Sequence, residues 1–88
     1  MNIKMVTYEG DLTQFLVDST SNDEAIQLAI QANKSDILGA YEEEFLEDME
    51  DPTFYTVDDI DDMNILGEIM RRDDYVGNYN GTLIFMGA

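Results

Sequence analysis

Hydrophobic and polar residues alternate along the first positions of the chain. Over residues 2–9, Ile3 and Met5 fall on one side of an extended backbone and Val6 falls on the other. Gly10 then interrupts the pattern, and most residues before it favour extended structure. The pattern predicts a strand from Asn2 to Glu9.

The next apolar run is short and supports two interpretations. Asp11 is suited to cap a turn of helix that contains Leu12, Phe15 and Leu16. The run from Leu12 to Val17 is equally suited to a second strand. Both interpretations stay open from the sequence.

Two stretches further on show helical spacing. Ser21 with Glu24 matches a capping box, and the mostly apolar residues that follow predict a well-buried helix ending near Asn33. Ser35 precedes a longer amphipathic stretch, which Pro52 ends. Its apolar residues recur every four positions, at Ile37, Tyr41, Phe45 and Met49. A helix from Asp36 to Asp51 is therefore predicted.

A similar capping pattern occurs at Thr56 and Asp59. Apolar residues at three-residue intervals follow it, and Arg71 and Arg72 lie where a helix macrodipole favours positive charge. This pattern predicts a helix from Val57 to Arg72.

The end of the chain carries a hairpin signal. Asn80-Gly81 is typical of a tight type I′ turn, and it lies between Tyr75–Tyr79 and Thr82–Met86. We expect this hairpin to join the N-terminal strand in a three-stranded antiparallel sheet. About three helices would pack on one face of it, so residues 1–88 would form a single α+β domain.

Composition narrows the functions that such a domain could perform. Twenty acidic residues against four basic ones give a formal net charge of −16, which argues against direct binding to nucleic acid or an anionic membrane. A basic protein surface is the natural partner. The chain has no Cys and no His, which excludes disulfides, thiolate chemistry and imidazole catalysis. No long apolar run marks a signal peptide or membrane span, so we expect a cytoplasmic protein.

The negative charge is concentrated in the middle of the chain. Eleven of the twenty-one residues from Glu42 to Asp62 are acidic, and none is basic. Like-charged neighbours such as Glu43 and Glu47 repel one another on a helix by ~0.2–0.5 kcal/mol. A chain that needed only solubility would spread these charges. The predicted helix 36–51 would carry about one charge per 3 Å, against one per ~3.4 Å on a DNA strand.

Catalytic and metal sites are poorly supported. The acidic pairs would lie on exposed faces, which lack the water-excluding pocket that acid–base catalysis requires. The spacing from Asp62 to Asp73 resembles a calcium-binding loop, but Leu66 occupies a ligand position and donates no oxygen. We therefore expect neither an enzyme nor a metal or cofactor site.

The candidate partner-binding residues are the clustered carboxylates and one aromatic residue that could anchor an interface. They are Asp36, Glu42, Glu43, Glu44, Glu47, Asp48, Glu50, Asp51, Tyr55, Asp58, Asp59, Asp61 and Asp62.

In size, charge and charge clustering the chain resembles the small acidic DNA-mimic inhibitors of phages and mobile elements, such as anti-restriction and anti-CRISPR proteins. The resemblance implies that carboxylates replace phosphates in the basic groove of a nuclease or other DNA-binding protein. It implies no cofactor and no direct contact with nucleic acid. The host bacterial cytoplasm would be its location if a phage encodes it.

Two alternatives and the oligomeric state stay open. The chain could plug the active-site cleft of a basic enzyme, as barstar-type inhibitors do, or it could be an acidic adaptor without inhibitory action. Apolar residues such as Leu12, Phe54 and Ile84–Met86 allow either a monomer or a homodimer.

Overall fold

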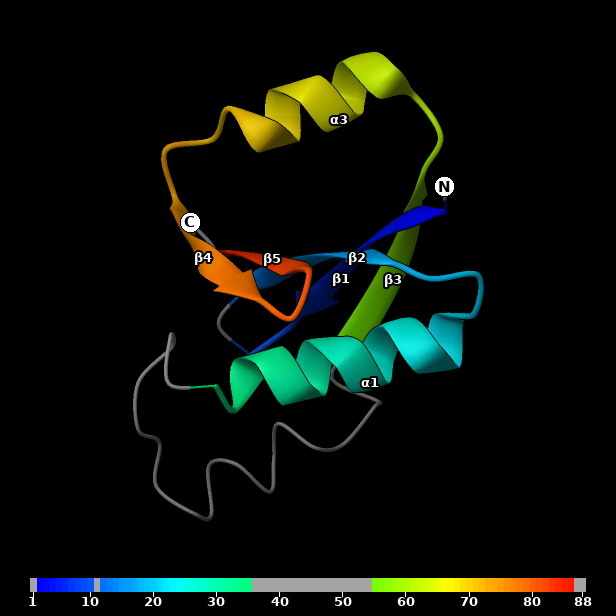
Figure 1. The fold of residues 1–88 in the computed structure, drawn as a ribbon, viewed down its shortest axis with the longest axis vertical. Helices are drawn as coiled ribbons and strands as arrows, with labels where there is room; N and C mark the ends of the chain where they lie inside the picture. The colour runs from blue at the N-terminus through cyan, green and yellow to red at the C-terminus, as the bar shows by residue number, and fades with distance from the viewer. Residues whose placement is uncertain (1, 11, 36–54, 87–88) are drawn as a thin grey trace.

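A computed structural model of the chain describes residues 2–10, 12–35 and 55–86. These residues form an α+β fold with a five-stranded antiparallel sheet and two helices (Figure 1). The strands are β1 (Ile3–Tyr8), β2 (Gln14–Asp18), β3 (Tyr55–Ile60), β4 (Tyr75–Tyr79) and β5 (Thr82–Phe85). The sheet order is β3-β1-β2-β5-β4, so the predicted sheet of three strands was too small.

The first two strands form a hairpin. β1 confirms the strand predicted at the N-terminus, and it pairs with β2 from Ile3 opposite Asp18 to Thr7 opposite Gln14. β2 confirms the strand interpretation of its segment, and the helical alternative is wrong. Phe15 and Leu16 point to opposite faces of the sheet, and both are buried. A strand buried on both faces lacks the polar alternation that would have identified it.

The C-terminal hairpin is confirmed. Asn80 and Gly81 have φ angles of 50° and 92°, the left-handed values that a type I′ turn requires at both central positions. The two strands that flank them, β4 and β5, pair from Tyr79 opposite Thr82.

Helix α1 (Asn22–Asn33) confirms the predicted buried helix. The Ser21 hydroxyl accepts a hydrogen bond from the Glu24 backbone N–H at 3.4 Å, as the capping pattern predicts. The helix contacts the sheet through mostly small residues, which allow close approach. Its buried residues are Ala25, Ala29, Ile30, Ala32 and Asn33.

The helix predicted from Val57 to Arg72 is wrong over its first half. Residues 55–60 form strand β3, and helix α3 covers only Met63–Met70. The spacing of Val57 and Ile60 fits a helix, but here the two side chains lie on opposite faces of an edge strand. Acidic residues are unfavourable in central strands but are tolerated at an edge, where they discourage pairing with other chains.

The helices lie on opposite faces of the sheet, not on one face as predicted (Figure 1). Val6, Phe15 and Ile84 form a core with α1. Met5, Leu16 and Phe85 form a second cluster on the other face, against which Leu66 and Ile69 of α3 pack.

The predicted helix 36–51, its end at Pro52, and Phe54 lie outside the described residues. Neither described helix is long and apolar enough to cross a membrane. Ile84 and Phe85, which the sequence suggested as surface residues, are buried in the sheet, whereas Leu12 and Met86 are exposed.

Candidate functional site

The described part of the acidic cluster lies along one edge of the sheet. Asp58 and Asp59 belong to β3, the edge strand next to β1, and Asp61 and Asp62 connect β3 to α3. All four side chains are exposed. We call these four residues the acidic edge.

The acidic edge presents charge to both faces of the sheet. Side chains alternate along a strand, so the register of β3 on β1 assigns each carboxylate to a face. Asp59 is opposite Lys4 on the face covered by α1, and Asp58 is opposite Met5 on the face covered by α3. The carboxylates therefore form a rim around the edge and not a patch on one face.

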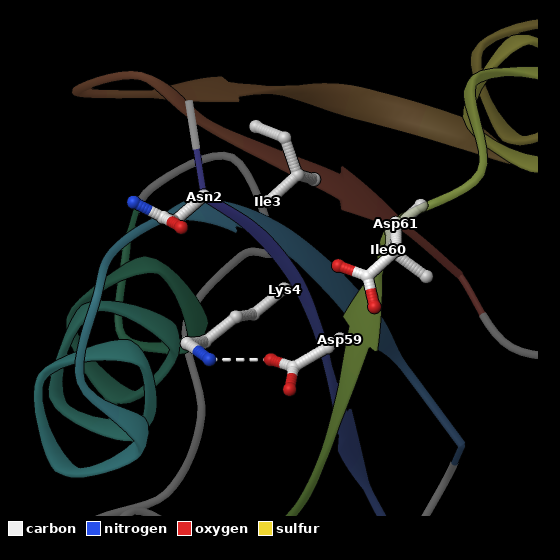
Figure 2. Close-up of a pocket in the computed structure, with 6 residues that line it drawn as sticks. All are labelled: Asn2, Ile3, Lys4, Asp59, Ile60 and Asp61. Carbon is white, nitrogen blue, oxygen red and sulfur yellow. Dashed lines mark hydrogen bonds and ion pairs between the residues drawn. The ribbon is translucent and has the colours of Figure 1, made fainter.

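One member of the acidic edge is paired within the chain. The Lys4 ammonium group donates a hydrogen bond to the Asp59 carboxylate (Figure 2). Lys4 is only 8% exposed, and a buried ammonium group is strongly unfavourable without a charged partner. The Asp59 side chain is 61% exposed, so Asp59 compensates the lysine while it still faces solvent.

A small polar hollow opens beside this ion pair. Its volume is about 130 Å³, several times the ~30 Å³ that one water occupies in the liquid. Its lining comes from the start of β1 and the end of β3: Asn2, Ile3, Lys4, Asp59, Ile60 and Asp61 (Figure 2). Of the two carboxylates in this lining, Asp59 is committed to Lys4. Asp61 has no basic partner among the described residues.

Asp62 has a structural role at the start of α3. It is the N-cap residue, and its carboxylate accepts a hydrogen bond from the Asn64 backbone N–H at 2.8 Å. Negative charge is favourable at this end of a helix. The sequence placed Asp62 in the first turns of a helix, but the helix begins one residue after it.

Tyr55, the predicted aromatic anchor, is buried in the α1 core. It is 6% exposed, and its ring stacks on that of Tyr8 with 5.2 Å between the centroids. Its hydroxyl accepts a hydrogen bond from the Asn33 amide at 3.0 Å. Tyr55 therefore presents no exposed ring in this structure.

The other eight candidate residues lie outside the described part of the chain. They are Asp36, Glu42, Glu43, Glu44, Glu47, Asp48, Glu50 and Asp51.

A second ion pair holds the chain after α3. Arg72 donates to Asp74 from Nε at 2.9 Å and from Nη2, and its Nη1 donates to Gln14. Its guanidinium group lies 5.2 Å from the centroid of the Phe85 ring. The hydrogen bond from Arg72 lowers the pKa of Asp74; desolvation opposes this effect and the positive charge of Arg72 adds to it.

Sequence reasoning did not identify these roles of Lys4 and Arg72. The only available signal was that four basic residues are surrounded by twenty acids, so each base is expected to find a carboxylate. Among the described residues, Lys4 and Arg72 are held in internal ion pairs. This arrangement leaves Asp58, Asp61 and Asp62 without a basic partner among the described residues.

In the described part of the chain, no group of three or more acidic side chains is placed to hold a metal ion. Comparisons with protein-family models, curated proteins and solved structures gave no match. The case for a function therefore depends on the chemistry of the acidic edge.

Proposed function

We propose that this protein is a DNA-mimic inhibitor of the anti-CRISPR or anti-restriction type. It would occupy the basic nucleic-acid-binding groove of a host defence nuclease or another DNA-binding protein. The observation that carries the proposal is the run of exposed carboxylates along the acidic edge. Residues 55–70 contain no Lys or Arg, although Lys4 of β1 pairs with Asp59.

The spacing of these carboxylates supports the proposal. An extended chain advances ~3.3 Å per residue, so Asp58 to Asp62 spans about 13 Å. Four carboxylates lie within that length. A DNA strand carries about four phosphates over the same distance, at one per ~3.4 Å. Because Asp59 is paired with Lys4, the segment from Asp58 to Asp62 carries three uncompensated carboxylates, against about four phosphates on the DNA strand.

The mechanism would be competitive and would involve no catalysis. Lys and Arg side chains that normally hold phosphates would bind the acidic edge, and duplex DNA would be excluded from the groove. Since β3 is fixed in the sheet by β1, its carboxylates are already in place before binding. Binding would therefore lose less conformational entropy than binding by a flexible acidic peptide.

An affinity capture with DNA competition tests the proposal. Tagged protein is incubated with a bacterial lysate at low and at raised salt, and the retained proteins are identified. We expect a DNA-processing enzyme whose retention weakens with salt and which duplex DNA of any sequence displaces. Retention of a basic enzyme that DNA does not displace would contradict the mimic mechanism.

Charge-neutralising variants then test the acidic edge itself. Asp58→Asn, Asp61→Asn and Asp62→Asn each remove one charge and keep the shape of the side chain. At position 62, Asn also preserves the helix cap. The matched control is Glu9→Gln with Glu24→Gln, two exposed acids elsewhere in the fold. We expect a graded loss of affinity with each edge variant and little change with the control.

The hollow beside Asp61 favours a second candidate, the plug of a basic active-site cleft. A single Lys or Arg side chain of an enzyme could insert there, beside the carboxylate of Asp61. In that case Asp61→Asn alone would abolish most of the binding, whereas Asp58→Asn would have little effect.

A further inference from the structure

Helix α3 exposes much of its apolar surface. No residue of the helix is buried, and only Leu66 and Ile69 pack against the cluster on the sheet. Met63 is 77% exposed, Ile65 is 47% exposed and Met70 is 56% exposed. Met63 and Met70 lie on one flank of the helix, and we call these two residues the α3 apolar surface.

The helical positions of these residues define its shape. At 3.6 residues per turn, Met63 and Met70 lie two turns apart on the same flank of the helix, separated by about 10.5 Å. Ile65 lies on the other flank of the seam formed by Leu66 and Ile69. Ile65 is therefore outside this surface. Single exposed apolar residues are common, but two methionines on one flank of an eight-residue helix mark a surface suited to binding. Methionine is flexible and polarisable, so it adapts to partners of different shape.

Most of the charged side chains near this surface are carboxylates, although the exposed Arg71 follows Met70 at its end. Asp58 lies on the same face of the sheet, Asp61 and Asp62 precede the helix, and Glu68 lies within it. A second copy of the chain would bring another net charge of −16 against these groups, which disfavours self-association. The charge also disfavours an anionic membrane. The complementary partner is apolar along one side and positively charged around it.

We infer that the α3 apolar surface, with its rim of carboxylates, binds a basic amphipathic helix of the partner protein. The apolar stripe of that helix packs on Met63 and Met70, and its Lys and Arg side chains contact the rim. Binding of an amphipathic helix through apolar anchors at one- and two-turn spacing is a common recognition mode. This inference deepens the proposed function, on which it rests, by naming the element of the partner that is bound.

A peptide-binding experiment tests the inference without the natural partner. The probe is a fluorescent 18-residue peptide of Leu and Lys with helical amphipathic spacing. The control peptide has the same number of Lys residues, with Ser in place of Leu. Anisotropy titrations are made with the whole protein at low and at raised salt. We expect the Leu–Lys peptide to bind at least tenfold more tightly and to retain more of its affinity at raised salt.

Two protein variants locate the binding. The double variant Met63→Gln, Met70→Gln should weaken binding of the Leu–Lys peptide by about tenfold or more. Its fold should be unaffected because both side chains are exposed. Leu12→Gln is the control, an exposed apolar residue on the β1–β2 turn, and it should bind like the original protein.

The outcomes separate this inference from the proposed function. Equal affinity for the two peptides, or unchanged affinity in the methionine variant, would overturn the inference and leave an electrostatic role of the acidic edge intact. Concentration-dependent dimers that the methionine variant abolishes would also overturn it, because a second copy would then occupy the surface. Failure of the proposed function would appear differently, as binding of a natural target that Asp58→Asn and Asp61→Asn leave unchanged.

Discussion

The two faces of the sheet are covered to very different degrees. On one face α1 buries five of its own residues against a core that includes Phe15, Val17 and Ile84. On the other face Met5, Leu16 and Phe85 are buried, but no residue of α3 is. Both helices are amphipathic segments next to an apolar sheet surface, and only one of them is packed as a core element.

This difference in burial means that the two faces contribute unequally to the stability of the fold. Apolar burial stabilises a fold by ~25 cal/mol per Å² removed from water, so the α1 face contributes more to the free energy of unfolding. An eight-residue helix has little stability of its own and depends on its contacts with the sheet. We therefore expect that a partner bound at α3 would disturb the α1 core little. The acidic edge lies between these two regions, at the side of the sheet that leads into α3.

A matched pair of core truncations should reveal the difference most strongly. Ile30→Ala on α1 should lower the free energy of unfolding by about 3 kcal/mol, because it leaves a cavity in a closed core. Ile69→Ala on α3 should lower it by about 1 kcal/mol, because that side chain is only partly buried. Urea unfolding followed by circular dichroism measures both values. Equal losses would show that the two faces contribute alike.

The ion pair beside α1 should give the next largest effect. Asp59→Asn leaves the Lys4 ammonium group buried without a charged partner, so we expect a loss of about 2 kcal/mol in the free energy of unfolding. In the double variant Lys4→Met, Asp59→Asn, the buried charge is also removed, and most of the loss should be recovered. Thermal unfolding of the three proteins tests this. A double variant less stable than Asp59→Asn would contradict it.

Substitution of the glycine in α3 should reduce the difference between the faces. A Cβ atom at Gly67 would meet nothing within 4 Å, so Gly67→Ala introduces no clash. Replacing glycine by alanine inside a helix stabilises it by about 0.5–1 kcal/mol. Hydrogen exchange of the α3 amides should slow by about two- to fivefold, while exchange in α1 stays the same. Slower exchange in both helices would indicate that they open together.

The smallest effect concerns the ion pair after α3. Arg72 lowers the pKa of Asp74, so the pair stabilises the fold above the ordinary value of 3.8. That contribution is lost as the pH falls through the lower folded-state pKa. An NMR titration of the Asp74 carboxyl group should give a value below 3.8, and Arg72→Gln should return it toward 3.8. An unchanged midpoint in the variant would exclude Arg72 as the cause.

Local signals in the sequence identified the elements that short-range physics determines. The alternation before Gly10, the capping residues Ser21 and Glu24, and the Asn80-Gly81 turn each predicted an element that the structure contains. Prediction failed where the secondary structure of a segment depends on its position in the sheet. The same Val57 to Ile60 spacing serves a helix or an edge strand, and only the pairing with β1 distinguishes them.

The candidate site was predictable to a similar extent. The acidic character of Asp58, Asp59, Asp61 and Asp62 was visible in the sequence, as was their exposure. Their arrangement along an extended edge was not, because it depends on a pairing between distant segments. The burial of Tyr55 was not predictable for the same reason: it lies beside acidic residues in sequence but beside Tyr8 in space.

The pairing of β3 with β1 has a consequence for how the chain folds. Lys4 and Asp59 are 55 residues apart in sequence, whereas β1–β2 and β4–β5 are local hairpins. Closing a long loop loses more chain entropy than closing a hairpin, and distant contacts slow folding. We expect the hairpins to form early and β3 to dock late. The acidic edge would then be complete only in the last stage of folding, so a partner that recognises it would select fully folded molecules.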